Sequence, residues 1–195
     1  MRRRRFASFI TLLLVALALG IGQRAEARSK PTERLRQAGK TALVYRGPAL
    51  DLALSYRYAK ANLGKRWLFL DVAMTSPDGS VEVARNHVAV VTPDGQIVPL
   101  ASQRQFADAY STLIPSIAGA NVAAEPLGYL TPHRPRWLGL FSAPGRTVVF
   151  PSVWVDEWHT IYGRLYFDLP DKVVPGQYAL LITLKQGEVR VPFQL

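Results

Sequence analysis

Aromatic and basic side chains gather along residues 134–166, where together they could bind a ligand. The set comprises Trp137, Trp154, Trp158, Tyr162 and Tyr166, with Arg134, Arg136 and Arg164 beside them. Flat aromatic faces stack on sugars or peptides, and guanidinium groups donate charge-assisted hydrogen bonds to anionic groups. We therefore predict a binding surface for a protein or a glycan, formed by His133, Arg134, Arg136, Trp137, Trp154, Trp158 and His159. A second interpretation stays open, in which the tryptophans fill the ends of a β-sandwich core.

The three histidines, His87, His133 and His159, are the residues most suited to metal or proton chemistry. A zinc site needs three or four converging ligands, and here only Asp156 and Glu157 stand near a histidine in the sequence. Surface or strand-end histidines explain the same pattern, so no metal site is expected.

The sequence lacks the motifs of common enzymes. No G-x-S-x-G, H-E-x-x-H or phosphate-binding glycine loop occurs, and the chain has no cysteine to act as a nucleophile. We therefore expect no catalytic residues, no cofactor and no enzymatic activity. An enzyme whose catalytic residues match no recognisable motif remains an alternative.

The N-terminus has the organisation of a secretory signal. Four arginines at 2–5 precede an uncharged apolar run at 6–22, and Ala25-Glu26-Ala27 follows as a small-x-small cleavage site. We predict a signal peptide over 1–27 and a mature protein in the bacterial periplasm or outside the cell. Two alternatives stay open: an uncleaved membrane anchor, because the run is just long enough to span, and a twin-arginine signal.

Cleavage would lower the net charge from +10 to +6, because five arginines and one glutamate leave with the signal. No concentrated basic run remains, so nucleic acid is not an expected partner. Residues 28–40 are polar and basic, and we interpret them as a solvated leader; a tether to an anionic surface such as lipid headgroups is the alternative. The membrane would otherwise be contacted only through an uncleaved N-terminus.

From residue 41 onward the hydrophobic pattern mostly has a period of two, which is typical of β-strands. Residues 67–74 carry apolar side chains on both faces, which predicts a strand covered on both sides at one end. Two Pro-Asp-Gly turns, at 77–79 and 93–95, link strands into an antiparallel meander.

The period changes to that of a helix over 102–125. Ser102 and Gln105 have the spacing of a capping box, and apolar residues then recur at helical spacing. Pro115 is expected to kink this helix or to begin a second one. We expect its apolar face to cap an open end of the β core.

Together, about nine short strands with one helical insert predict an all-β, antiparallel β-sandwich that forms one domain over 41–195. Residues 163–170 and 175–180 resemble the last hairpin of exported bacterial immunoglobulin-like domains, and 68–72 with 90–95 are similar to their first long hairpin. The resemblance implies an immunoglobulin-like sandwich but assigns no functional residue.

These observations favour an exported, non-enzymatic binding or accessory module of the bacterial envelope. An alternative is a structural or assembly protein of the envelope that is held by an uncleaved N-terminal anchor.

Overall fold

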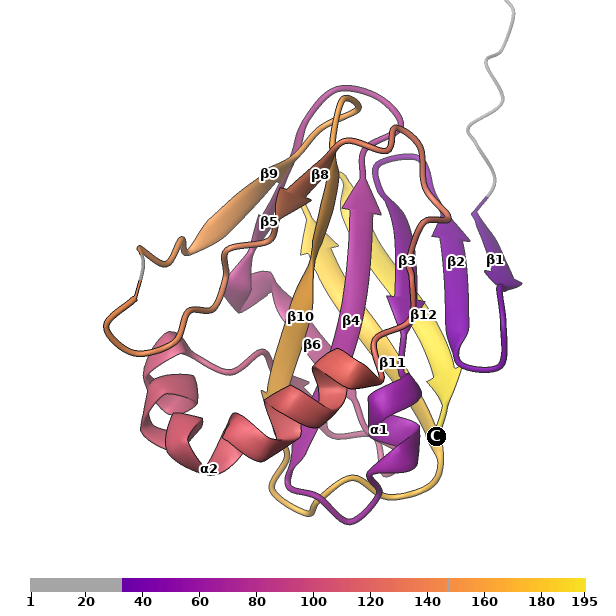
Figure 1. Cartoon of the computed structure of the whole chain (residues 1–195). Helices are drawn as coiled ribbons and strands as arrows, with labels where there is room; N and C mark the ends of the chain where they lie inside the picture. Colours follow the sequence, from indigo (N-terminus) through magenta and orange to yellow (C-terminus); the bar gives the residue numbers. More distant parts are fainter. Residues whose placement is uncertain (1–32, 147) are drawn as a thin grey trace, which may run out of the picture. The chain divides into compact units, whose positions relative to one another are not determined.

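β-strands make up most of the described part of the chain. The computed structural model describes residues 33–146 and 148–195, and in these it forms twelve strands in three sheets with two α-helices (Figure 1). The signal peptide predicted over 1–27 lies outside the described residues. Within them, no helix is both long enough and apolar enough to cross a membrane. The prediction of a mostly β domain is confirmed.

The largest sheet has six strands in the order β1-β2-β3-β4-β10-β8. They are β1 (Arg34–Gln37), β2 (Ala42–Arg46), β3 (Asp51–Ser55), β4 (Trp67–Thr75), β10 (Thr160–Asp168) and β8 (Pro135–Trp137). Neighbours are antiparallel except β8, which runs parallel to β10. The short helix α1 (Arg57–Ala61) connects β3 to β4.

Two smaller sheets complete the β structure. The four-stranded sheet has the order β12-β11-β6-β7, and a two-stranded sheet pairs β5 with β9. Their bounds are β12 (Gly187–Gln194), β11 (Gln177–Leu184), β6 (Val88–Val91), β7 (Ile97–Pro99), β5 (Val81–Ala84) and β9 (Ser152–Val155). One turn of 3-10 helix, η1 (Arg85–His87), leads from β5 into β6.

The alternation along β4 places the main core between the six-stranded and four-stranded sheets. Leu68 and Leu70 point into this core, where they join Leu180 of β11 and Val191 of β12. Because successive side chains of a strand point to opposite faces, Phe69 points away from it, into a second cluster under a helix. Strand β4 is therefore covered on both sides, as its sequence predicts.

The helical insert is α2 (Gln103–Val122), and the predicted capping box is present. The Oγ of Ser102 accepts a hydrogen bond from the Gln105 N–H at 3.1 Å, and the Ser102 N–H donates to Gln105 Oε1 at 2.8 Å. Pro115 lies inside one continuous helix, whose axis changes direction along its length (Figure 1). The sequence left open a kink or a second helix, and the structure has one helix.

The expected position of α2 is wrong. Its buried residues Phe106, Leu113 and Ala120 pack on Phe69 and Tyr166, so the helix lies across the outer face of the six-stranded sheet. The reason is that β4 and β10 each carry a large aromatic side chain on that face. Covering these rings removes their apolar surface from water.

The segment 28–40, expected as a solvated leader, contains strand β1. Arg34–Gln37 pairs with β2 in an antiparallel register, although all four of its residues are exposed. A strand at the edge of a sheet can add through backbone hydrogen bonds without burying side chains, so the hydrophobic pattern carries no sign of it.

Gly163 of β10 provides a test of the main core. A Cβ at this position would overlap the Cβ of Leu138 and lie 2.9 Å from its Cδ2, and Leu138 is buried in the core between the sheets. We expect Gly163→Ala to lower the free energy of unfolding by ~1–3 kcal/mol through overpacking. Urea unfolding followed by circular dichroism measures this change.

The matched control is Gly128→Ala, because a Cβ there meets no atom within 4 Å. It should leave the unfolding midpoint almost unchanged. Equal midpoints for the two variants would contradict the packing of Leu138 over Gly163.

Candidate functional site

Strand β8 separates the predicted binding residues onto two faces of the six-stranded sheet. In its register with β10, Trp137 lies opposite Tyr162 and Arg136 lies opposite Ile161. Ile161 belongs to the core between the sheets, whereas Tyr162 packs against the cluster on the other face. Since side chains alternate along a strand, Trp137 is on the α2 side and Arg136 is on the opposite side.

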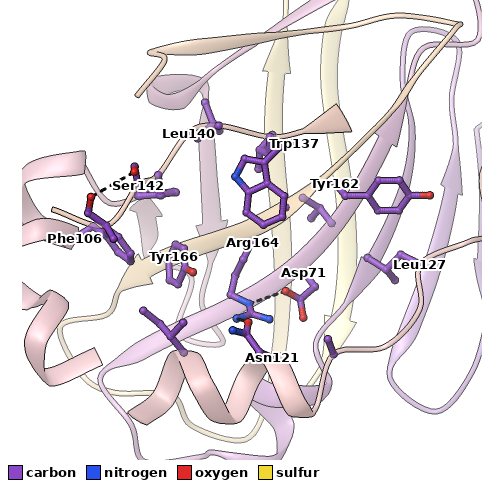
Figure 2. A pocket seen from close by; sticks show the side chains of 18 of the residues that line it. Asp71, Phe106, Asn121, Leu127, Trp137, Leu140, Ser142, Tyr162, Arg164 and Tyr166 are labelled. Carbon is purple, nitrogen blue, oxygen red and sulfur yellow. Dashed lines mark hydrogen bonds and ion pairs between the residues drawn. The ribbon is translucent and has the colours of Figure 1, made fainter. Parts of the chain in front are cut away.

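On the α2 side, the sheet carries a cleft of about 440 Å³. It lies between α2 and the segment 137–143, above β4 and β10 (Figure 2). Six aromatic side chains line it: Phe106, Tyr110, Trp137, Phe141, Tyr162 and Tyr166. The Trp137 side chain is the most open of the large apolar groups here, with 75% of its residue surface exposed.

The floor of the cleft is an ion pair between two strands. Arg164 of β10 lies directly opposite Asp71 of β4, and its Nε donates to Asp71 Oδ1 at 2.6 Å. Its Nη1 donates to Asn121 Oδ1 at 3.0 Å, and its Nη2 donates to the Ala120 carbonyl at 3.1 Å. The two ionised side chains are only 9% and 19% exposed. The guanidinium therefore joins both strands to the end of α2 in a largely desolvated place.

Aromatic rings packed edge-on or tilted against one another form the wall beside this ion pair. The Tyr166 ring centroid lies 4.6 Å from that of Phe106, 5.0 Å from that of Phe141 and 4.8 Å from that of Phe69. Burial raises the pKa of the Tyr166 hydroxyl, although the Arg164 charge acts in the opposite direction. Tyr166 is therefore an uncharged, fixed part of the wall at neutral pH.

A second carboxylate stands at the far end of the cleft. Glu125, which lines it, follows α2 in the chain. Its Oε2 accepts hydrogen bonds from the Thr41 hydroxyl at 3.0 Å and the Ser55 hydroxyl at 3.2 Å. These bonds fix the segment after α2 against β3 and the turn before β2.

Asp71 and Glu125 were missing from the residues predicted from sequence. For Asp71 a signal existed, because an acidic residue inside the apolar run 67–74 must find a partner if both faces of the strand are covered. For Glu125 no such signal is present in the sequence.

Of the seven predicted binding residues, only Trp137 lines the cleft. Trp154, on β9 opposite Glu82, is 60% exposed, and Trp158 is 62% exposed in the turn that follows. His133 and Arg134 are exposed in the loop before β8. The tryptophans of this set thus do not fill the core, but the structure does not gather the seven residues on one surface.

Arg136 and His159 meet at Asp156, away from the cleft. An Arg136 Nη1 lies 3.6 Å from Asp156 Oδ2, and His159 Nδ1 lies 3.0 Å from Asp156 Oδ1. Asp156 Oδ1 also accepts from the N–H groups of Trp158 and His159, at 2.9 and 2.8 Å. Burial acts to raise the pKa of Asp156, but these hydrogen bonds outweigh it and the pKa lies below the ordinary value. The carboxylate braces the turn that carries Trp158.

The described residues offer no metal centre. In residues 33–146 and 148–195, no group of three or more histidine, aspartate or glutamate side chains is placed to hold a metal ion. The cleft lining includes none of the three histidines, all of which lie in the described part.

Comparison with known proteins assigns the chain to no family and suggests no function. No family model, no curated protein and no solved structure matches the chain.

The ion pair on the cleft floor leads to a stability prediction. Arg164→Met would leave the Asp71 carboxylate in a desolvated place without its partner, and breaking such a pair costs ~3–5 kcal/mol of unfolding free energy. The double variant Asp71→Leu/Arg164→Met should recover a large part of the loss, because no charge is then stranded. Chemical unfolding of the four proteins in the double-mutant cycle measures the coupling.

Arg104 and Asp108 form an exposed i,i+4 pair on α2 with an N–O distance of 3.9 Å, and they serve as the control. Arg104→Ala should change stability by less than ~0.5 kcal/mol. If Arg164→Met changed the free energy of unfolding as little as Arg104→Ala, the Arg164–Asp71 pair would not stabilise the floor of the cleft.

Proposed function

We propose that the protein is an exported, non-enzymatic binding module of the bacterial envelope that holds part of a protein or glycan partner in the cleft between α2 and the six-stranded sheet. The observation that carries this proposal is the aromatic lining of the cleft, with Trp137 standing open at its edge. A large aromatic side chain left in water beside a cavity is typical of a recognition surface.

Binding is favoured over catalysis by the way the cleft uses its charges. Asp71 and Arg164 neutralise each other at 2.6 Å, and the Glu125 carboxylate is held by two hydroxyls. The two hydroxyls that bond to Glu125, those of Thr41 and Ser55, do not line the cleft, so neither is placed to attack a ligand held there. Such a floor can orient a ligand through hydrogen bonds.

We also propose that the sandwich is immunoglobulin-like, which fits an envelope binding role. The order β12-β11-β6-β7 corresponds to G-F-C-C′ of that fold, and the β4–β10 pair corresponds to B and E. The hydroxyl of Tyr178, near the start of β11, bonds to the backbone of Val174 at 3.0 and 3.1 Å, as in a tyrosine corner. The parallel strand β8 is a departure from this pattern.

The export part of the proposal makes a prediction of its own. The mature protein should begin at Arg28, because cleavage follows Ala27, and N-terminal sequencing of the protein from a periplasmic fraction would detect this. The double variant Ala25→Leu/Ala27→Leu should block cleavage, since the peptidase accepts only small residues at these two positions. Recovery of the intact N-terminus from membranes would favour the anchored alternative.

The cleft part is tested with two tryptophan variants. Wild-type protein would be applied to a glycan array and to a phage-displayed peptide library, and the affinity of the strongest ligand measured by calorimetry. Trp137→Ala should weaken binding at least about tenfold, since it removes an exposed aromatic contact. Its thermal unfolding should be unchanged, because the side chain is mostly exposed.

Trp154→Ala is the matched control, as it removes an indole that is also mostly exposed but lies outside the cleft. If Trp154→Ala weakened binding and Trp137→Ala did not, the binding site would lie at β9 instead of the cleft. The absence of any ligand in both libraries would argue against a binding module.

A further inference from the structure

We propose that the cleft recognises an uncharged sugar unit, with one face of the sugar ring against Trp137 and its hydroxyl groups on Asp71 and Asn121. This inference rests on the binding function proposed above and names the chemical class of the ligand.

The first argument is the shape of the apolar wall. A sugar ring has faces made of C–H groups, which pack flat on aromatic rings, and a rim of hydroxyl groups. Trp137 and its strand neighbour Tyr162 both line the cleft, and Figure 2 shows the Trp137 ring in view above the Arg164–Asp71 pair. An indole and a set of hydrogen-bonding groups thus line the same cavity. This arrangement matches the two chemical characters of a sugar ring.

The second argument is the set of hydrogen-bonding atoms that remains on the floor. Asp71 Oδ1 and Asn121 Oδ1 both accept from Arg164. Among the described residues, Asp71 Oδ2 and Asn121 Nδ2 have no hydrogen-bond partner, so the two residues that Arg164 holds present one acceptor and one amide donor. A hydroxyl group both donates and accepts, so the hydroxyl groups of a sugar can bond to both atoms.

The same atoms argue against an apolar peptide side chain as the occupant. A leucine or phenylalanine placed over the floor would remove Asp71 Oδ2 and the Asn121 amide from water without offering either a partner. Each buried polar group left in this way weakens binding. The aromatic wall alone fits a peptide, but the aromatic wall and polar floor together fit a carbohydrate better.

The third argument is charge, which selects against acidic sugars. The acidic and basic side chains that line the cleft are Asp71, Glu125 and Arg164. Arg164 is already paired with Asp71, so the Glu125 carboxylate leaves the cavity with an excess negative charge. A uronic acid or a phosphorylated sugar would be repelled, despite the positive net charge of the chain as a whole.

The experiment is calorimetric titration of the exported protein with three neutral disaccharides, namely N,N′-diacetylchitobiose, cellobiose and maltose. The anionic control is digalacturonate, and the second control is the best peptide from the phage selection. We expect at least one neutral disaccharide to bind with a Kd of about 1 mM or tighter. Digalacturonate should bind at least about tenfold more weakly.

Asn121→Asp is the informative variant. It keeps the oxygen that accepts from Arg164, so the fold should be retained, but it removes the amide donor and adds a negative charge. Neutral disaccharide affinity should fall about tenfold, as it should for Trp137→Ala, while Trp154→Ala keeps wild-type affinity. Circular dichroism melting of each variant separates a lost contact from lost folding.

The outcomes separate this inference from the function on which it rests. If the peptide binds in a Trp137-dependent way and no neutral disaccharide does, the sugar proposal is wrong and the binding module remains. If digalacturonate binds best, the charge argument is wrong and the proposal of a neutral ligand is lost. If neither sugar nor peptide binds, both proposals fail.

Discussion

The contacts of a single guanidinium, that of Arg164, connect the layers of this protein that form the cleft. Arg164 sits on β10, faces Asp71 on β4, and reaches across to Asn121 and the Ala120 carbonyl of α2. The Ala120 carbonyl lies in the last turn of the helix, where backbone acceptors lack intrahelical partners. One side chain therefore satisfies the end of α2 and neutralises a carboxylate on the sheet. Ion pairs of this kind add little net stability, so the value of this one is that it fixes where the helix ends relative to the strands.

The cleft exists because α2 covers only the apolar part of the outer sheet face. That part is formed by Phe69 and Tyr166, which pack under the helix. Further along the same two strands, Asp71 and Arg164 occupy the same face, and covering them with apolar side chains would be costly. The helix ends beside these charges, and the segment after it packs Leu127 and Leu130 on the next apolar part of the sheet. The partly polar strip between the two covered regions forms the floor of the cavity.

Short-range patterns in the sequence predicted much of the local structure, but they did not predict which distant residues lie on one surface. The two-sided burial of β4, the pairing of β6 with β7 across the turn at 93–95 and the capping box of α2 all depend on residues a few positions apart. The meander predicted across the turn at 77–79 is wrong, because β5 pairs with the distant strand β9 and not with β4. The register that places Arg164 opposite Asp71 joins residues 93 apart in the chain, and no short-range pattern in the sequence predicts it. The aromatic residues along 137–166 suggested one surface because they are close in sequence. In a β protein, however, neighbouring residues point to opposite faces, and Trp154 and Trp158 belong to another strand and its turn.

The same alternation explains how an exposed tryptophan can be held in place. Leu138 follows Trp137 and points the other way, into the core, where its side chain occupies the space that Gly163 leaves empty. Its N–H donates to the Tyr162 carbonyl at 2.8 Å, so the backbone beside Trp137 is fixed to β10. Because the backbone beside the ring is already ordered, ligand binding has less chain to order there, and that saving favours affinity. Core packing of Leu138, the residue after β8, thus fixes the backbone that carries Trp137, which links the stability of the sandwich to the proposed binding function.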